Sequence, residues 1–506
     1  MFMEELMRIL INPYFVGALL VAFGFFLRVR PRLKAKSRGV DTWYFLACVR
    51  EYKKNHKIPI VLRNYLLDID EQWYPPGFTV FLSIFPLKFL EKFQWLIGPL
   101  IDCLQLILVY ALTLGWTGNL TAAVLAGLVY ASAPTLVAEN STLNSRGLGS
   151  LNFTLLLLVF FAYLASGNLL ILGVAFILSF FLFLTHGMAI QNLAFVSLVF
   201  SLVFWRIDFA LFLIAGFVIA SIFSAGLYIK VLKGKIEVMR FWAKNLRNLG
   251  AHQIYDSEIY ANPERSGKRL FPLFHQPGLK GAIKHLKHIF GHNPWIVFLP
   301  LALLFAPVFG FGFWPFIFWW ATLTYIFIFL TTFVPSFRFL GEGYKYIKLA
   351  IFPLAYMAGV MTAASPILPY FFMVILGLCV FLSVKFVGRQ TYDAQNETLK
   401  KIYGYLELRP EDGVMILPTH IADSTAFLTG KKVLWGTHTS DGTGRWAKVE
   451  EFFPVIQKPI EYFFKKYDLH FLLLDKNFVE PEDLKLGPEF EKILEKDNYS
   501  LFKYGG

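Results

Sequence analysis

The sequence is poor in charged residues and in cysteine. Only 16% of its 506 residues are Asp, Glu, Lys or Arg, whereas soluble globular chains carry about 25%. Hydrophobic residues make up 56% of the chain, with 55 Phe among them. This composition excludes a disordered chain and argues against a single soluble core. Three cysteines exclude a scaffold built on disulfides. A polytopic membrane protein fits instead, because lipid accommodates long apolar runs.

About eleven apolar runs approach the roughly 20 residues that a membrane-spanning helix needs. We expect spans near 11–27, 96–116, 119–138, 147–166, 168–186, 189–205, 208–230, 294–310, 312–334, 346–363 and 366–387. The first run lacks a preceding basic segment and a small-residue cleavage site, so we expect a retained span rather than a signal peptide. The run 78–90 has about 13 residues, too few for an ordinary span, and is expected at the interface or in a re-entrant position.

Counting one change of side per span places all long connections on one face of the membrane. These are the segments 28–95, 139–146, 231–293 and 335–345, together with the tail from Gly388. We expect a multi-pass protein of the cell (inner) membrane whose large loops, 28–95 and 231–293, and C-terminal domain are external. The basic run 28–38 conflicts with the positive-inside rule. Either the chain is inverted, or these charges serve anionic ligands.

Charge is unevenly distributed along the chain. Residues 1–388 carry a net charge of +16, whereas the tail 389–506 carries −3. The basic part suggests membrane lipids with anionic headgroups, or phosphate-bearing lipid substrates, as partners. The basic residues lie in loops between spans, so no nucleic acid is expected.

The tail 389–506 differs from the rest in composition and in periodicity. Strand-like runs at 413–419 and 469–475, and a short apolar run at 432–436, alternate with helical patterns at 393–405, 447–466 and 489–496. This alternation predicts a soluble α/β domain. We therefore expect a transmembrane catalytic domain over 1–388 and an external α/β domain over 389–506.

Two acidic residues fall on the predicted external face. Asp41 directly precedes an apolar-periodic segment, where an acid suits a helix N-cap. It can alternatively act as a general base or a metal ligand at the membrane surface. Glu139 follows the third predicted span on the same face. Together the two carboxylates could activate an acceptor or bind a divalent cation such as Mg²⁺ or Mn²⁺. No cofactor is certain.

Cationic residues at span ends are candidates for a phosphate partner. Arg146 begins the fourth span, where binding a phosphate and snorkelling to the interface are both reasonable interpretations. His186 ends the fifth span, where a structural role competes with a functional one. The segment 333–355 places further candidates beside the tenth span, where Arg and Lys suit a lipid-linked phosphate: Arg338, Glu342, Tyr344, Lys345 and Lys348.

Three histidines in the loop 231–293 have helical spacing. His285, His288 and His292 follow an i, i+3, i+7 pattern that permits metal ligation from one face. Lys284 and Lys287 lie between them, and neighbouring cations disfavour another cation. A headgroup-facing amphipathic helix is the alternative.

The order of these segments resembles the GT-C membrane glycosyltransferases, a superfamily that includes protein mannosyltransferases and the oligosaccharyltransferase catalytic subunit. The resemblance rests on the order of a span, then GVDTWYFLACVREYKKNHKIP, then YPPGF, then SAPTLV…NSRGLGSL. It implies that Asp41 is the essential acid of the first external loop. By the same resemblance Glu139 is a second acid, and Arg338 with its neighbours engages the lipid phosphate.

The resemblance also implies a function. We expect transfer of a sugar from a polyprenyl-phosphate-linked donor to a protein, lipid or glycan acceptor of the cell envelope. Asp41 would be the general base; Arg146, His186, Arg338, Tyr344 and Lys345 would bind the donor phosphate; Tyr74 and Glu342 would contact the acceptor or the loops. The second loop lacks a paired-acid motif and the tail lacks WWDYG, so a monosaccharide is favoured over a whole oligosaccharide.

Two other functions compete with sugar transfer. A transporter commonly buries charges at the bilayer midplane and shows repeated halves. Here no repeat is visible, and Asp102 is the chief charge inside a predicted span. A non-catalytic scaffold for envelope assembly is the other alternative, and it predicts no requirement for Asp41.

Overall fold

The chain forms two compact units, which are described separately. The structure is a computed structural model, and it describes residues 12–37, 39–67, 71–260, 264, 278–305, 314–388, 396–436 and 445–505. The first unit comprises residues 1–36, 93–225 and 283–391, and the second comprises 37–92, 226–282 and 392–506. The two long loops expected on the external face therefore fold together with the C-terminal segment.

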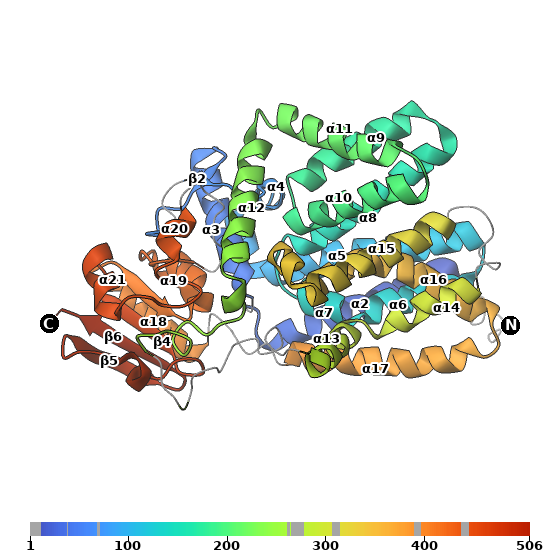
Figure 1. Ribbon diagram of the computed structural model, residues 1–506. Coiled ribbons are helices and arrows are strands. Elements are labelled where there is room, and N and C mark those ends of the chain that lie inside the picture. Colours follow the sequence, from blue (N-terminus) through green and yellow to red (C-terminus); the bar gives the residue numbers. More distant parts are fainter. Residues whose placement is uncertain are drawn as a thin grey trace. The chain divides into compact units, whose positions relative to one another are not determined.

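The first unit is a bundle of apolar helices that run beside one another (Figure 1). Its α-helices are α2 (Pro13–Lys34), α5 (Leu87–Thr117), α6 (Leu120–Ser132), α7 (Pro134–Asn140), α8 (Arg146–Ser166), α9 (Leu169–Phe183), α10 (Gly187–Val203), α11 (Asp208–Phe223), α13 (Gly278–His292), α14 (Phe298–Leu304), α15 (Trp314–Phe333), α16 (Ile351–Ala364) and α17 (Leu368–Gly388). Three 3-10 helices connect them: η3 (Pro294–Val297), η5 (Pro335–Leu340) and η6 (Gly343–Ala350).

The predicted polytopic helical class is confirmed, but fewer helices than expected have the length of a full crossing. Among the described residues, 6 helices are long and apolar enough to cross a membrane, and up to 8 if each of two bent pairs is one span. The bent pairs are α6 with α7 and α11 with α12 (Leu227–Lys244). Three more of the expected eleven spans correspond to shorter apolar helices: Leu169–Phe183, Gly187–Val203 and Pro294–Leu304.

Several predicted loop boundaries fall inside helices. The loop expected to start at residue 28 begins later, because α2 continues to Lys34 and buries Arg28 and Arg32. The predicted start of the second long loop, residue 231, falls inside α12, which continues to Lys244. The run 78–90 forms the short helix α4 (Gly77–Ser83) followed by the first turn of α5, and α4 is indeed too short to span. The length of an apolar run predicts which part of a helix faces lipid. The helix itself can extend beyond that run, because its backbone hydrogen bonds do not depend on apolar side chains.

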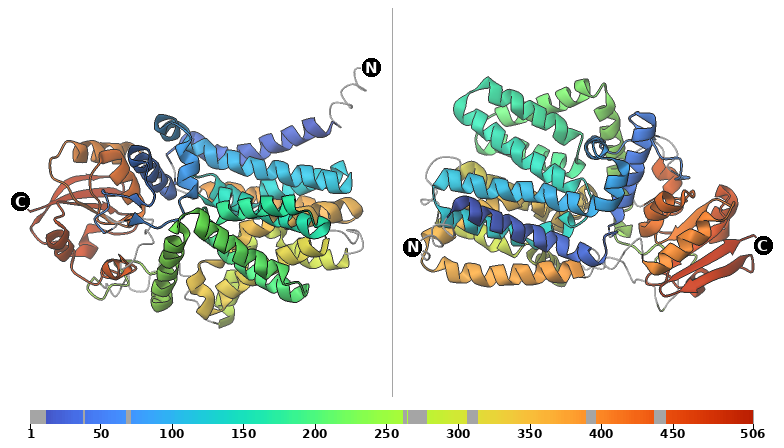
Figure 2. Two further views of the ribbon diagram at one scale, coloured as in Figure 1. Left: turned by 90° about the horizontal axis from the view of Figure 1, so that it is seen from above. Right: turned by 180° about the vertical axis from the view of Figure 1, so that it is seen from behind.

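The second unit contains a four-stranded sheet (Figure 2). The strand order is β3-β4-β6-β5, with β3 parallel to β4 and the other pairs antiparallel. The strands are β3 (Val414–Leu417), β4 (Phe471–Asp475), β5 (Phe490–Lys496) and β6 (Tyr499–Tyr504). Around them lie α3 (Val40–Asn55), η1 (Leu246–Asn248), α18 (Glu397–Glu407), η7 (Thr419–Ile421), α19 (Ala422–Thr429), α20 (Arg445–Val449), α21 (Ile460–Tyr467) and η8 (Pro481–Leu484), and a small hairpin pairs β1 (Ile60–Val61) with β2 (Glu71–Gln72).

The core of this unit combines the tail with the two long loops. Leu472 and Leu474 of β4 share a buried cluster with Phe241 of α12, Ile254 and Leu67. Burying these side chains stabilises the fold only when all three segments are present, because each supplies one wall of the same apolar core.

The predicted helix at 489–496 is wrong, because this segment is the edge strand β5. Its pairing with β6 shifts register between Lys492 and Leu494. A β-bulge places two consecutive residues against one partner and interrupts the period of two. The interrupted alternation of EFEKILEK looks helical in the sequence. Its charged side chains suit an exposed edge, where charge prevents pairing with other chains.

Helices α6 and α16 approach each other closely through small residues. A Cβ placed on Gly359 would lie 2.6 Å from the Ala122 carbonyl oxygen and 2.7 Å from the Ala126 nitrogen. Backbone atoms cannot move aside as a flexible side chain can, so the contact requires glycine. Small residues at such contacts are typical of helix packing in membranes.

We predict that Gly359→Ala lowers the thermal stability of the purified protein in detergent. Overpacking costs about 1–3 kcal/mol, which a melting curve resolves. Gly377→Ala in α17 is the matched control, because a Cβ there meets no atom within 4 Å. Equal melting temperatures for the two variants would contradict the close approach of α6 and α16.

Candidate functional site

A buried ion pair joins two helix ends in the first unit. Lys348 Nζ of η6 lies 2.8 Å from Glu139 Oε2 of α7, and their side chains are 1% and 11% exposed. Pro134 at the start of α7 helps to break the helix, so α7 bends by 55° from α6 and ends at Glu139 and Asn140. Removing one member of a buried pair costs about 3–5 kcal/mol. The pair therefore fixes η6 against α7.

Asn144 joins Glu139 to Arg146 through the backbone. Its side-chain amide donates to the Glu139 carbonyl oxygen at 2.7 Å, and its side-chain oxygen accepts the Arg146 N–H at 2.9 Å. The Arg146 side chain also interacts electrostatically with the Glu139 carboxylate. The turn can sit directly on α5 because Gly98 has no side chain: a Cβ there would lie 2.6 Å from the Thr142 carbonyl oxygen. This turn therefore holds an acidic residue, Glu139, and a basic residue, Arg146, close together in one short segment.

A buried pair of charged residues inside the bundle is hydrogen-bonded to the end of α7, where this turn begins. The Arg28 guanidinium pairs with Asp102 and also donates to backbone carbonyls of α2 and α6. The other Asp102 oxygen accepts the Tyr130 hydroxyl at 2.6 Å and the Asn140 amide at 2.7 Å. Arg28 and Asp102 are each 1% exposed. Side chains of α2, α6 and α7 thus contact one carboxylate of α5. Asn140 directly follows Glu139, so this contact also fixes the position of Glu139.

A second ion pair lies at the start of η6. Lys345 Nζ is 2.7 Å from the Glu342 carboxylate. Burial by itself raises the pKa of Glu342, but the Lys345 charge and hydrogen bonds from Lys345 and Tyr344 outweigh it and hold this pKa below its ordinary value. Glu342 is therefore ionised at neutral pH. Gly343 allows η6 to pack on α15, because a Cβ there would meet the Ile328 carbonyl oxygen at 2.6 Å.

Three aromatic rings from α13 and η6 form a cluster beside these charges. The ring centroids of His288 and His292 are 4.2 Å apart, and Tyr344 lies 4.8 Å from His288 and 4.7 Å from His292. Burial, and to a smaller extent the neighbouring His292, lowers the pKa of His288 to about 4. Burial also lowers the pKa of His292. Both rings are uncharged at neutral pH, so the fixed positive charge of the site comes from Arg and Lys.

For two of the predicted phosphate-binding residues, His186 and Arg338, the contacts described here are to the backbone of nearby segments rather than to this cluster. His186 is buried and caps α10, since its Nδ1 accepts the Ala189 N–H at 3.2 Å. The Arg338 Nε donates to the Thr332 carbonyl oxygen at 3.1 Å, and the Arg338 charge acts on His285. These contacts give His186 a capping role, whereas Arg338 is partly buried in η5, which follows α15.

Asp41 and Tyr74 belong to the second unit. Asp41 is the second residue of α3, and Gly39 occupies the N-cap position. The N-cap interpretation is therefore wrong, although an acid in the first turn still favours the helix electrostatically. The Tyr74 ring packs against Tyr44 and Phe45 of α3 at centroid distances of 5.9 and 6.0 Å. Tyr74 thus helps to hold the first turns of the helix that carries Asp41.

The described part of the chain contains no group of three or more His, Cys, Asp or Glu side chains arranged to hold a metal ion. His285, His288 and His292 accordingly do not form the metal site that their spacing permits. Asp41 and Glu139, the candidate ligands for a divalent cation, lie in different compact units.

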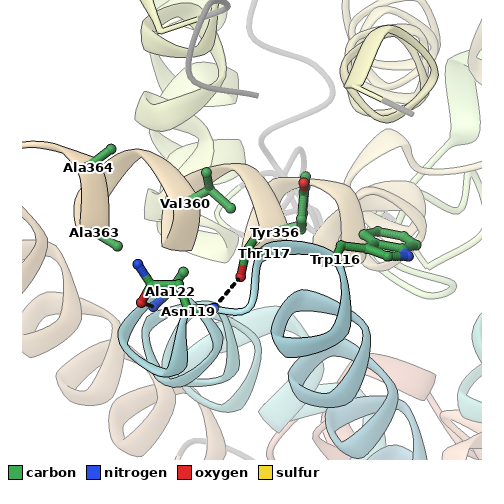
Figure 3. Close-up of a pocket in the computed structure, with 8 residues that line it drawn as sticks. All are labelled: Trp116, Thr117, Asn119, Ala122, Tyr356, Val360, Ala363 and Ala364. Carbon is green, nitrogen blue, oxygen red and sulfur yellow. Dashed lines mark hydrogen bonds between the residues drawn. The ribbon is translucent and has the colours of Figure 1, made fainter. Parts of the chain in front are cut away.

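A separate pocket of about 340 Å³ lies at the other end of the α6 helix (Figure 3). Trp116 and Thr117 at the end of α5, Asn119 at the start of α6, and Tyr356 of α16 line it. The Trp116 and Tyr356 rings meet edge to face at 5.3 Å. The Thr117 hydroxyl and the Asn119 side chain already accept backbone N–H groups. None of the predicted site residues lines this pocket.

The sequence does not predict three sets of contacts in the site. Lys348 is among the candidates of its segment, but nothing marks it as the partner of a residue 209 positions away. Asn144 and the Arg28–Asp102 pair likewise act through contacts that no local pattern encodes. An intramembrane acid such as Asp102 is a general signal for a buried partner.

We predict that acid destabilises the protein through His288. Its pKa is about 4 in the folded chain and 6.5 as the ordinary value, so the unfolded chain binds the proton more readily between these values. The free energy of unfolding therefore falls as pH drops from 6.5 to 4. Melting temperatures of wild type and His288→Gln across this range should show a shallower loss for the variant. His56→Asn, at an exposed position, should retain the wild-type slope, and parallel slopes for all three proteins would refute the assignment.

Comparison with solved structures identifies the fold. ArnT from Cupriavidus metallidurans, bound to undecaprenyl phosphate, superposes with a TM-score of 0.59 over 96% of this chain and 97% of that one, at 13% identity. The oligosaccharyltransferase of Archaeoglobus fulgidus in complex with Zn and sulfate gives 0.57 over 97% of this chain and 73% of that one, at 14% identity. The oligosaccharyltransferase AglB from the same archaeon, in complex with an inhibitory peptide and a dolichol-phosphate, gives 0.53 over 92% of this chain and 69% of that one, at 13% identity.

Comparisons of sequence alone find no counterpart. No protein-family model matches the chain, and no curated protein is similar to it in sequence. The likeness therefore lies in the fold, across almost the whole length of ArnT. The predicted GT-C architecture is confirmed: the chain has the fold shared by these membrane glycosyltransferases.

Proposed function

We propose that this protein is a membrane glycosyltransferase that uses a polyprenyl-phosphate-linked sugar donor. One observation carries the proposal. The cluster around η6 contains three cations, Arg146, Lys345 and Lys348, and two carboxylates, Glu139 and Glu342. Its histidines are uncharged, so these five side chains sum to one positive charge. A phosphate at the membrane boundary complements that excess.

The proposed donor site uses the residues at the ends of α8 and η5 and in η6. Arg146 and Lys345 would bind the phosphate oxygens, and Arg338 and Tyr344 would complete the site. Arginine presents a planar fork of donors that matches a phosphate. Undecaprenyl phosphate and dolichol-phosphate in the structures of ArnT and AglB support a carrier of this class. The acceptor would be a component of the cell envelope, reached on the external face of the cell membrane.

The proposed reaction is a single displacement at the anomeric carbon of the sugar. The acceptor hydroxyl attacks this carbon, the bond to the phosphate oxygen breaks, and the electron pair leaves with the phosphate. Asp41 takes the proton of the acceptor hydroxyl as general base. The cations stabilise the charge that develops on the leaving phosphate. Glu139 keeps Lys348 and Arg146 in place, and it is the alternative base if Asp41 is not.

The buried charges favour this proposal over a transporter. A transporter uses intramembrane charges to bind its cargo, whereas Asp102 is occupied by Arg28, Tyr130 and Asn140. This network serves the structure of α7. A non-catalytic scaffold differs from the proposal in requiring no base.

We predict that Asp41→Asn abolishes most of the sugar transfer. Loss of a positioned general base costs about 10²–10⁴-fold in rate. The variant loses a first-turn charge worth about 0.3–1 kcal/mol, so it should remain folded. Transfer from a radiolabelled polyprenyl-phosphate sugar is measured beside a melting curve. Glu51→Gln, at the other end of α3, is the control and should keep full activity. Full activity of Asp41→Asn would shift the role of base to Glu139, whereas absence of transfer by the wild type would support the scaffold.

We predict that Arg146→Gln weakens binding of the donor lipid, whereas His186→Asn does not. A charged hydrogen bond contributes about 1.5–3 kcal/mol, equivalent to about 10–150-fold in the dissociation constant. Asparagine caps a helix well and can accept the Ala189 N–H that the His186 ring accepts. Binding of a polyprenyl phosphate to the detergent-solubilised protein tests both variants. Weaker binding by His186→Asn at unchanged stability would return His186 to the donor site.

A further inference from the structure

Helix α13 presents three different faces to its surroundings. His285 and Ile289 are buried, at 3% and 2% exposure. Ile283, Leu286 and Phe290 are 42%, 49% and 37% exposed. At about 100° per residue these three lie within about 60° of one another on the helix. They form an exposed apolar stripe on a helix whose opposite side is packed.

Lysines border this apolar stripe. Lys284 and Lys287 are exposed and lie next to the stripe, on the side away from Ile289. Neither lysine forms an ion pair with a described residue. The exposed surface of α13 thus combines large apolar side chains with adjacent positive charge.

The contacts of its buried face place α13 at a membrane boundary. The His285 ring lies 5.7 Å from that of Phe333, the last residue of the span Trp314–Phe333. The His288 ring lies 4.8 Å from Tyr344, the second residue of the span Gly343–Ala364. The apolar helix Pro294–Leu304 starts two residues after α13 ends. Three apolar helices therefore begin or end against α13, which Figure 1 shows nearly end-on while α16 and α17 run across the view.

We propose that α13 lies in the membrane surface and binds anionic phospholipids. Ile283, Leu286 and Phe290 enter the outer part of the acyl region, and Lys284 and Lys287 bind the headgroup phosphates. A helix with these two adjoining surfaces binds membranes through apolar burial and through attraction to anionic lipids. Long lysine side chains reach from the apolar boundary to the headgroups.

A bilayer explains the surface of α13 better than a protein partner does. A protein partner would need acids placed opposite both lysines and an apolar groove at the matching angle. The membrane supplies both chemistries at the depth where the three neighbouring helices end. The inference does not depend on sugar transfer, since it concerns the lipid around the protein and not the donor.

Fluorescence quenching in reconstituted vesicles tests the proposal. The full chain carries an NBD label on Leu286→Cys, and wild type serves as blank because Cys48, Cys103 and Cys379 are buried. Doxyl-labelled phosphatidylglycerol or phosphatidylcholine is added at equal mole fractions. We expect strong quenching at residue 286 and a local excess of the anionic lipid of about fivefold per lysine. A label on Lys465→Cys, exposed on α21 of the second unit, should not be quenched.

The lysine variants separate the two halves of the proposal. Lys284→Gln with Lys287→Gln should equalise quenching by the two lipids, whereas Lys385→Gln on α17 should preserve the anionic preference. Absence of quenching at residue 286 would mean that protein covers the stripe and would overturn the proposal. Equal quenching by both lipids in the wild-type background, or a preference that survives the double substitution, would overturn the assignment of the headgroup site.

Discussion

The pairing of buried charge at a membrane boundary is the constraint on which the structure depends. Lys348 is almost completely buried, and its charge is tolerable only because Glu139 lies beside it. An unpaired charge in such surroundings costs several kcal/mol. The pair holds the end of α7 beside the last turn of η6, and the bend at Pro134 after α6 allows this approach. The buried Arg28–Asp102 pair constrains the helices around it in the same way, because neither charge can be left without its partner.

Much of the fold could be predicted from the sequence because lipid imposes a simple rule on composition. Long apolar runs must be helices in a membrane, so the helical class and the places of its helices follow from the sequence alone. Boundaries were less accurate, as the continuation of α2 to Lys34 shows. The strand at Phe490–Lys496 was misread because its bulge interrupts the alternation that identifies a strand.

The candidate site could be predicted only in part. Charges next to apolar runs identify Glu139, Arg146, Glu342 and Lys345, and the structure brings these four together. The sequence cannot tell which charges meet, because the partners are up to 209 residues apart. For His186 the sequence left a structural and a functional role open, and the hydrogen bond from the Ala189 N–H to its ring favours the structural one.

The close contact between α6 and α16 connects distant parts of the chain. The pocket lined by Trp116 and Tyr356 lies at one end of this helix pair, and Glu139 and Lys348 lie beyond the other. Gly359 is eleven residues from Lys348, or about 16 Å along a helix. Because the two backbones touch, neither helix can slide independently of the other. Sequence variation at this small residue is therefore expected to be as restricted as at the charged pair, although Gly359 is not among the candidate site residues.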